Sequence, residues 1–103
     1  MHITFRQLRL FLALAQTRSV SAAAQLMHVT QPTASMQLKE MSQAVGLPLY
    51  EVVGKKIYLT EVGKELAVTA REVAQAWEGF EQKVDAIKGL SRSEEHTSEL
   101  QSH

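Results

Sequence analysis

The chain has 103 residues and a formal net charge of zero, which is enough for one small domain with a modest core. It contains no cysteine, which excludes a disulfide framework and thiolate metal sites and is typical of a reducing cytoplasm. No apolar run approaches the length of a membrane span, and the N-terminus lacks a signal-peptide pattern. We therefore expect a cytoplasmic protein with no membrane association.

The charges are unevenly distributed along the chain. Residues 1–71 carry eight Lys or Arg against four Glu, and the acidic excess lies after Arg71. A locally basic segment suits contact with nucleic acid at one end of the molecule, although the charge pattern alone is a weak signal.

The first predicted helix runs from Phe5 to about Thr17. Thr4 followed three residues later by Gln7 is a capping-box pattern. Leu10 and Leu14 form a second apolar edge that we expect to meet another helix. The predicted inner face is made of Leu8, Phe11, Leu12 and Ala15.

Residues 19–46 predict two short helices joined by a tight turn. In the second, Thr30 is a favourable N-cap, Pro32 lies in the first turn, and Gly46 supplies a C-terminal stop. Its apolar residues recur at helical spacing and form the inward stripe: Ala34, Leu38, Met41 and Val45.

The opposite face of this second helix is short, polar and nearly uncharged. Gln31, Thr33 and Ser35 can donate and accept hydrogen bonds, and Met36 can contact a thymine methyl group. We interpret this face as a reader of base edges in the major groove of DNA; a solvated helix face is the alternative. The predicted base-reading residues are Gln31, Pro32, Thr33, Ser35 and Met36.

The first helix of the pair is capped by Ser19 or Ser21. Its three consecutive alanines (22–24) allow close approach of another helix, and Leu26 and Val29 are expected to anchor its far end. The turn over residues 27–30 is as short as a helix-turn-helix requires.

Residues 47–52 and 56–59 predict two short strands with a turn over residues 53–55, which together form a wing. Lys55 and Lys56 at its tip can follow the DNA backbone or enter the minor groove, although a solvated hairpin tip would show the same residues. Because lysine lacks the planar fork of arginine, we expect affinity rather than base choice from the wing. The predicted contacts to the DNA backbone are Thr30, Lys39, Lys55, Lys56 and Arg6.

Several motifs in this order and spacing resemble the N-terminal domain of LysR-type bacterial transcription regulators, over about Phe5 to Leu90. That family carries paired alanines, a leucine, a Ser/Thr-Gln-Pro run and a serine three residues after the proline. We match these to Ala22-Ala23, Leu26, Thr30-Gln31-Pro32 and Ser35. The chain departs from the family at Met41-Ser42, where Leu-Glu is frequent, and at Val52, where an arginine is frequent; the second departure removes an expected DNA contact.

The last predicted helix begins after Thr60 and extends to about Leu90. Its apolar residues settle into steps of three and four, which is the pattern of a coiled-coil seam. A domain this small needs a partner to cover so long a seam, and a second copy is the simplest. The alternative is a helix folded back on its own core, which we expect near Leu66. The seam consists of Val62, Leu66, Ala70, Val73, Trp77, Phe80, Val84 and Ile87.

The dimer interface is predicted to lie in the second half of this helix, with Trp77 and Phe80 as anchors. In LysR-type regulators this region resembles the linker helix that pairs two DNA-binding domains. The predicted interface residues are Val73, Trp77, Phe80, Val84 and Ile87.

Residues 91–103 are polar and have no apolar period. Residues 92–103 also resemble the translation of a common sequencing-library adapter. We interpret this tail as disordered and artefactual, and we expect the native reading frame to end near Leu90 or Ser91.

The predicted fold is mainly α: a winged helix-turn-helix of three helices and a two-stranded wing in residues 1–60, then a long dimerisation helix in residues 61–90. The predicted function is sequence-specific binding of double-stranded DNA as a homodimer. A helical interaction module without DNA readout is the alternative; no phosphate loop, metal-ligand cluster or nucleophile–base pair indicates an enzyme, a cofactor or a metal.

The resemblance further implies a truncated regulator. LysR-type regulators usually continue into an effector domain that senses a small molecule, so any effector would bind through a domain absent from these 103 residues, and the full-length protein can form a tetramer. The residues 47–51 and 54–66 look most like those of regulators of carbon-fixation operons.

Overall fold

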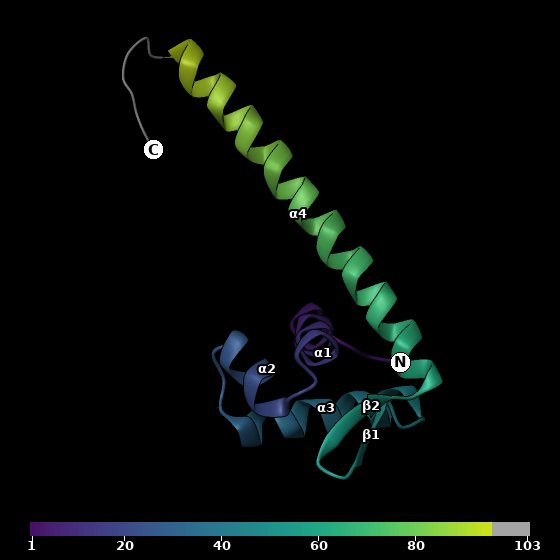
Figure 1. The fold of residues 1–103 in the computed structure, drawn as a ribbon. Helices are drawn as coiled ribbons and strands as arrows, with labels where there is room; N and C mark the ends of the chain where they lie inside the picture. The colour runs from purple at the N-terminus through teal and green to yellow at the C-terminus, as the bar shows by residue number, and fades with distance from the viewer. Residues whose placement is uncertain (96–103) are drawn as a thin grey trace. The chain divides into compact units, whose positions relative to one another are not determined.

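The computed structural model describes the backbone of residues 1–95 and the side chains of residues 1–90. In that part of the chain, four helices and a two-stranded sheet follow one another (Figure 1). This order confirms the predicted winged helix-turn-helix followed by a long helix. The elements are α1 (Phe5–Thr17), α2 (Val20–Leu26), α3 (Gln31–Val45), β1 (Tyr50–Val53), β2 (Lys56–Leu59) and α4 (Glu61–Glu95).

Local hydrogen bonds fix the predicted helix ends. At the start of α1, the Gln7 N–H donates to Thr4 Oγ1 at 3.1 Å and the Thr4 N–H donates to Gln7 Oε1 at 3.0 Å, which completes a capping box. At the start of α3, Thr30 Oγ1 accepts from the Thr33 N–H. The helix ends at Gly46, whose φ of 87° is a left-handed conformation that glycine adopts without steric cost.

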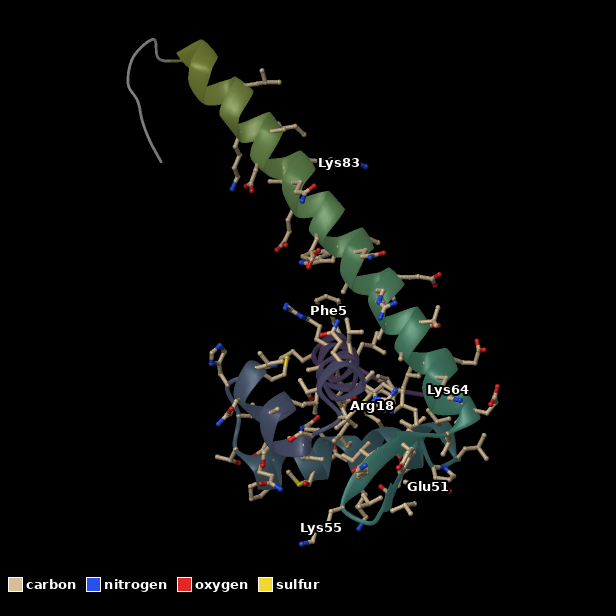
Figure 2. The ribbon with its side chains drawn as sticks, in the orientation of Figure 1. Phe5, Arg18, Glu51, Lys55, Lys64 and Lys83 are labelled. Carbon is tan, nitrogen blue, oxygen red and sulfur yellow. The ribbon has the colours of Figure 1, made fainter. Side chains whose placement is uncertain are left out.

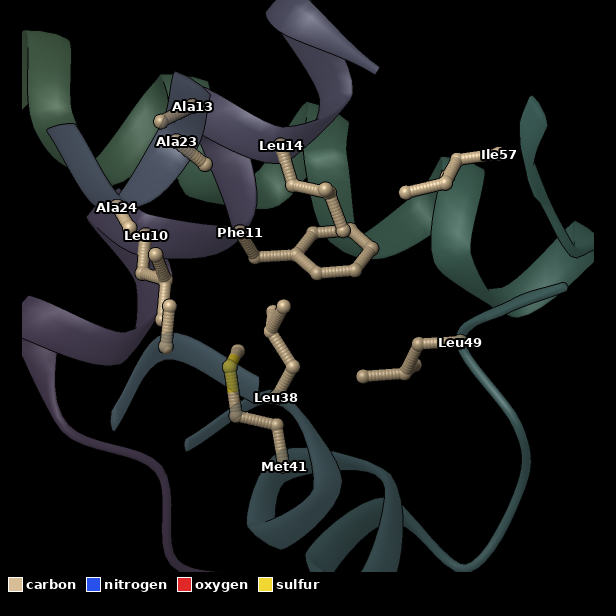
Figure 3. Packing of buried hydrophobic residues seen from close by; sticks show 11 residues of the cluster. Leu10, Phe11, Ala13, Leu14, Ala23, Ala24, Leu38, Met41, Leu49 and Ile57 are labelled. Carbon is tan, nitrogen blue, oxygen red and sulfur yellow. The ribbon is translucent and has the colours of Figure 1, made fainter. Parts of the chain in front are cut away.

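The core lies between α1, α3 and the segment that precedes β1 (Figure 3). Its largest fully buried side chains are Phe11, Leu14, Leu38, Met41 and Leu49. Burial of each of these stabilises the fold by roughly 1.5–3 kcal/mol relative to exposure.

The prediction of which residues of α1 face the core was wrong. The buried residues are Leu10, Phe11, Ala13 and Leu14, whereas Leu8, Leu12 and Ala15 are only half-buried. Because α1 is apolar on more than one side, periodicity does not decide which side faces inward, and contacts with both α2 and α3 do.

The register of α2 differs from the prediction by one residue. Ser19 is the cap, Ala23 and Ala24 are buried, and Met27 packs against the core. Leu26, expected to anchor the helix, is 58% exposed. Because three alanines follow one another, either of two neighbouring faces of α2 could be buried. The sequence does not show whether Leu26 or Met27 packs against the core.

The wing is shorter at its start than predicted. β1 and β2 are antiparallel, with Tyr50 opposite Leu59 and Val53 opposite Lys56. Residues 47–49 precede the sheet rather than belong to it. The carbonyl groups of Pro48 and Leu49 accept hydrogen bonds from Thr60 Oγ1 (2.7 Å) and the Thr60 N–H (3.1 Å), so this segment joins the wing to the start of α4.

The chain divides into two compact units within α4, between Glu72 and Val73. The first turns of α4 belong to the first unit because Val62, Leu66 and Ala67 pack against the core. No helix in the described part of the chain is long and apolar enough to cross a membrane.

The end of α4 also differs from the prediction. Disorder was expected from residue 91, but the helix continues through Glu95. Residues 91–95 contain no proline or glycine to stop it. The remainder of the predicted artefactual tail, residues 96–103, lies outside the described residues.

Candidate nucleic-acid interface

The outward face of α3 presents most of the predicted base-reading residues. Gln31, Pro32, Ser35 and Met36 are exposed, and Lys39 follows one turn later on the same face. Met36 is 53% exposed, so its side chain is available for contact on this face. Thr33 is half-buried, so it lies at the edge of this face rather than at its centre.

A hydrogen bond from α2 holds the side chain of Gln31, the first residue of α3. The Ser21 hydroxyl donates a hydrogen bond of 2.8 Å to Gln31 Oε1. The bond joins the first turns of the two helices of the helix-turn-helix, although both side chains are exposed.

Thr30 and Thr33 are joined by two hydrogen bonds. Thr30 Oγ1 accepts from the Thr33 N–H at 3.3 Å and donates to Thr33 Oγ1 at 2.9 Å. Thr30 is exposed, as a contact with the DNA backbone would require, but its hydroxyl hydrogen is directed to Thr33.

The middle of α3 is tied to the start of α1. Gln7 Nε2 donates to Gln37 Oε1 at 2.8 Å and to Glu40 Oε1 at 3.5 Å. Sequence reasoning assigned Gln7 only to its capping box and did not identify Gln37. Thirty residues separate the two glutamines, and no local pattern connects them.

Arg6 lies beside α3 in space. Its exposed side chain lines an open depression of about 560 Å³, together with Thr33, Gln37 and Glu40 of α3. The fold therefore brings a cation from α1 to one edge of the base-reading face, on the same side as Thr33.

The wing ends in a two-residue turn with both residues in the left-handed region. Gly54 has φ 57° and Lys55 has φ 68°, the geometry of the type I′ turn that matches strand twist. Lys55 and Lys56 are both exposed, and Figure 2 shows Lys55 projecting from the hairpin tip.

Arg18 holds the wing to the end of α1, a role that the sequence did not suggest. Its φ of 56° ends the helix, its Nε donates to the Ala15 carbonyl at 2.9 Å, and its Nη1 donates to the Ile57 carbonyl in β2 at 3.4 Å. A left-handed arginine at a helix end carries no sequence signature comparable to that of glycine.

Tyr50 lies at the base of the wing, opposite Leu59. Its partial burial raises the pKa of the phenol above the ordinary value of 10, because desolvation disfavours the charged phenolate.

The predicted dimer residues lie on the part of α4 that belongs to the second unit. Val73, Trp77, Phe80 and Ile87 are exposed, and Val84 is half-buried. The Trp77 and Phe80 rings are 5.4 Å apart between centroids and tilted by 39°, a favourable aromatic pair. Ile87 is 65% exposed.

Within the described residues, no group of three or more His, Asp or Glu side chains could hold a metal ion.

Two helices joined by a tight turn, a polar outward face on the second and a lysine-tipped hairpin define a winged helix-turn-helix DNA-binding domain. The chain belongs to the LysR family of bacterial regulatory helix-turn-helix proteins, whose family model matches residues 5–64.

The sequence is similar to regulators of carbon-fixation genes. It is 39% identical over 92 residues to the RuBisCO operon transcriptional regulator of Allochromatium vinosum, a match that covers 89% of this chain and 30% of that protein. The chain therefore spans about a third of the length of this relative.

Solved structures of the family share the fold. Vibrio fischeri DarR, determined in complex with DNA, matches with a TM-score of 0.76 and 32% identity over 87% of this chain and 31% of that one. The CbnR DNA-binding domain, determined as a DNA complex, matches with a TM-score of 0.74 and 29% identity over 84% of this chain and 99% of that one.

Proposed function

We propose that the chain binds double-stranded DNA sequence-specifically as a homodimer and belongs to the carbon-fixation branch of LysR-type regulators. The outward face of α3 carries this proposal. It is polar and exposed, and hydrogen bonds from α1 and α2 fix its orientation. The similarity to structures solved with DNA and to RuBisCO operon regulators supports it.

In this proposal the first half of α3 enters the major groove. Gln31, Ser35 and Met36 contact base edges, and Pro32 packs against the groove without donating a hydrogen bond. Thr33 is half-buried and contributes at the edge of the face, next to Arg6.

Cations around α3 contact the phosphates. Lys39 follows the reading face along the helix, Arg6 borders its start, and Lys55 and Lys56 hold the backbone from the wing. Backbone N–H groups near Thr30, at the positive end of the α3 dipole, receive a further phosphate.

Two copies pair through the second half of α4. A partner helix would cover the exposed Val73, Phe80 and Ile87, extend the aromatic pair of Trp77 and Phe80, and complete the burial of Val84. Pairing places two reading helices one helical turn or more apart on the same face of the DNA.

The whole regulator extends this picture. A longer protein of the family would add the effector-binding domain, could assemble as a tetramer and would act on DNA in the cytoplasm. The 103 residues themselves carry the DNA-binding part, since they align with about a third of their relative.

Selection from a random duplex library with the 103-residue chain tests the proposal and requires no known operator. We expect enrichment of an inverted repeat, and we expect a variant carrying both Gln31→Ala and Ser35→Ala to lose it while it remains folded and dimeric.

A purely helical dimerisation module is the second candidate, because the exposed seam of α4 alone would suit it. Dimerisation without enrichment of any sequence would favour this module and contradict the proposed function.

A further inference from the structure

The side chain of Gln7 connects the start of α1 to the middle of α3. Its Oε1 accepts from the Thr4 N–H at 3.0 Å, and its Nε2 donates to Gln37 Oε1 at 2.8 Å and to Glu40 Oε1 at 3.5 Å. A backbone N–H can only donate, so the carboxamide oxygen faces Thr4 and the amide nitrogen faces α3. Partners at α1 and in α3 therefore fix the orientation of this carboxamide at both of its ends.

The bonds from Gln7 set the rotation of α3 about its own axis. The buried side chains of α3 are alanine, leucine and methionine, and apolar contacts have little directional preference. Hydrogen bonds are directional, and those from Gln7 end on Gln37 and Glu40, about one turn apart. Gln37 directly follows Ser35 and Met36, so a rotation that breaks its bond also moves the base-reading side chains.

We propose that Gln7 is a positioning residue for sequence recognition, which holds α3 at the rotation that presents its outward face to base edges. This inference rests on the proposed function and assigns a role in specificity to a residue of α1. Gln7 is half-buried, and both of its amide hydrogens have partners in α3. Its removal should therefore reduce the preference for the specific site, whereas loss of a phosphate contact would weaken binding to every sequence alike.

Gln7 also caps α1, and two substitutions separate the cap from the connection to α3. Thr4→Ala removes the hydroxyl that accepts from the Gln7 N–H, but it leaves the Gln7 side chain and its partners in α3 in place. Gln37→Ala leaves the capping box intact and removes the shorter of the two bonds to α3. The first variant therefore weakens the end of α1, and the second weakens the hold on α3.

Two affinities measured for each protein test the inference: one for the inverted repeat that the wild type enriches, and one for a scrambled duplex of the same length. The ratio of the two should fall by at least about threefold in Gln7→Ala and in Gln37→Ala. The double variant should lose no more than the larger single loss, because both substitutions remove the same bond. Thr4→Ala should unfold at a lower temperature and retain the wild-type ratio.

Three results would overturn this inference alone: an unchanged ratio in Gln7→Ala, losses that add in the double variant, or an equal loss in Thr4→Ala. Additive losses would show that the two glutamines act on DNA separately, and an equal loss in Thr4→Ala would show that only the cap of α1 matters. If the folded wild type enriches no sequence, both the function and the inference fail. Circular dichroism at the assay temperature confirms that each variant is folded.

Discussion

Lys55 lies at the tip of the wing and has a left-handed backbone conformation, which residues other than glycine seldom adopt. Its φ of 68° and that of Gly54, 57°, form the tight turn of the hairpin. A left-handed conformation at a non-glycine residue costs about 1 kcal/mol or more, and the paired strands on either side maintain it. The turn thereby holds a lysine at the farthest point of the hairpin.

Replacement of Lys55 by alanine should weaken binding to specific and non-specific DNA alike. Alanine retains the Cβ atom, so the backbone cost of the turn is unchanged and only the charge is lost. The slope of log affinity against log salt should decrease in magnitude by about one. Titration at several salt concentrations measures it. Lys83→Ala removes the same charge from the second half of α4 and should leave the slope unchanged; equal slopes for wild type and Lys55→Ala would contradict the wing contact.

The raised pKa of Tyr50 predicts a loss of folding stability at alkaline pH. The folded-state pKa of its phenol is raised, so its contribution is complete below the ordinary value of about 10 and is lost as pH rises through the folded-state pKa. Urea unfolding at pH 8 and pH 11 should show a smaller alkaline loss of unfolding free energy for Tyr50→Phe than for wild type. Tyr58→Phe, an equivalent change at an exposed position of β2, should behave as wild type; an identical alkaline loss in all three proteins would contradict the prediction.

At the scale of single elements, local chemistry predicted the helix ends well and the buried faces less well. The caps at Thr4 and Thr30 and the stop at Gly46 act within four residues, so the sequence contains the whole cause. The face that α1 buries and the register of α2 depend on which partner helix each one meets. The Gln7–Gln37 bond likewise joins residues thirty positions apart, which no local pattern anticipates.

The start of α4 lies against the base of the wing with no room for a side chain at Gly63. A Cβ atom there would overlap the Leu49 carbonyl oxygen, which belongs to the backbone and cannot rotate away. Gly63→Ala should therefore lower the free energy of unfolding by about 1–3 kcal/mol, as overpacking does.

Gly79 provides the matched control in the same helix. A Cβ atom at Gly79 meets nothing within 4 Å. Gly79→Ala should raise helix stability by up to about 1 kcal/mol, because alanine has the higher helix propensity. Thermal unfolding followed by circular dichroism compares the two variants, and a Gly63→Ala protein as stable as Gly79→Ala would rule out the close approach.

At the scale of the molecule, α4 changes its role along its length. Its first turns complete the core through Val62 and Leu66, whereas Phe80 and Ile87 are more than half exposed in the second unit. The sequence seam was continuous and did not mark this division, because both parts use the same apolar spacing. The two parts differ instead in their surroundings, because the core of the first unit lies beside the first part and covers its apolar residues.

Charges placed in the seam should separate the proposed dimer. The combined change Phe80→Glu and Ile87→Glu puts like charges opposite each other in a paired helix, so the protein should sediment as a monomer. Its affinity for an inverted repeat should fall to that for a single half-site. Gln82→Glu lies on another face of α4 and should leave the dimer intact; a dimeric seam variant would show that pairing uses another surface.

The Ser21–Gln31 bond also places part of the outward face of α3 under the influence of a second helix. A substitution at Ser21 can therefore alter how Gln31 is presented without changing any residue of α3 itself. Variants with altered operator preference should accordingly arise in α2 as well as in α3.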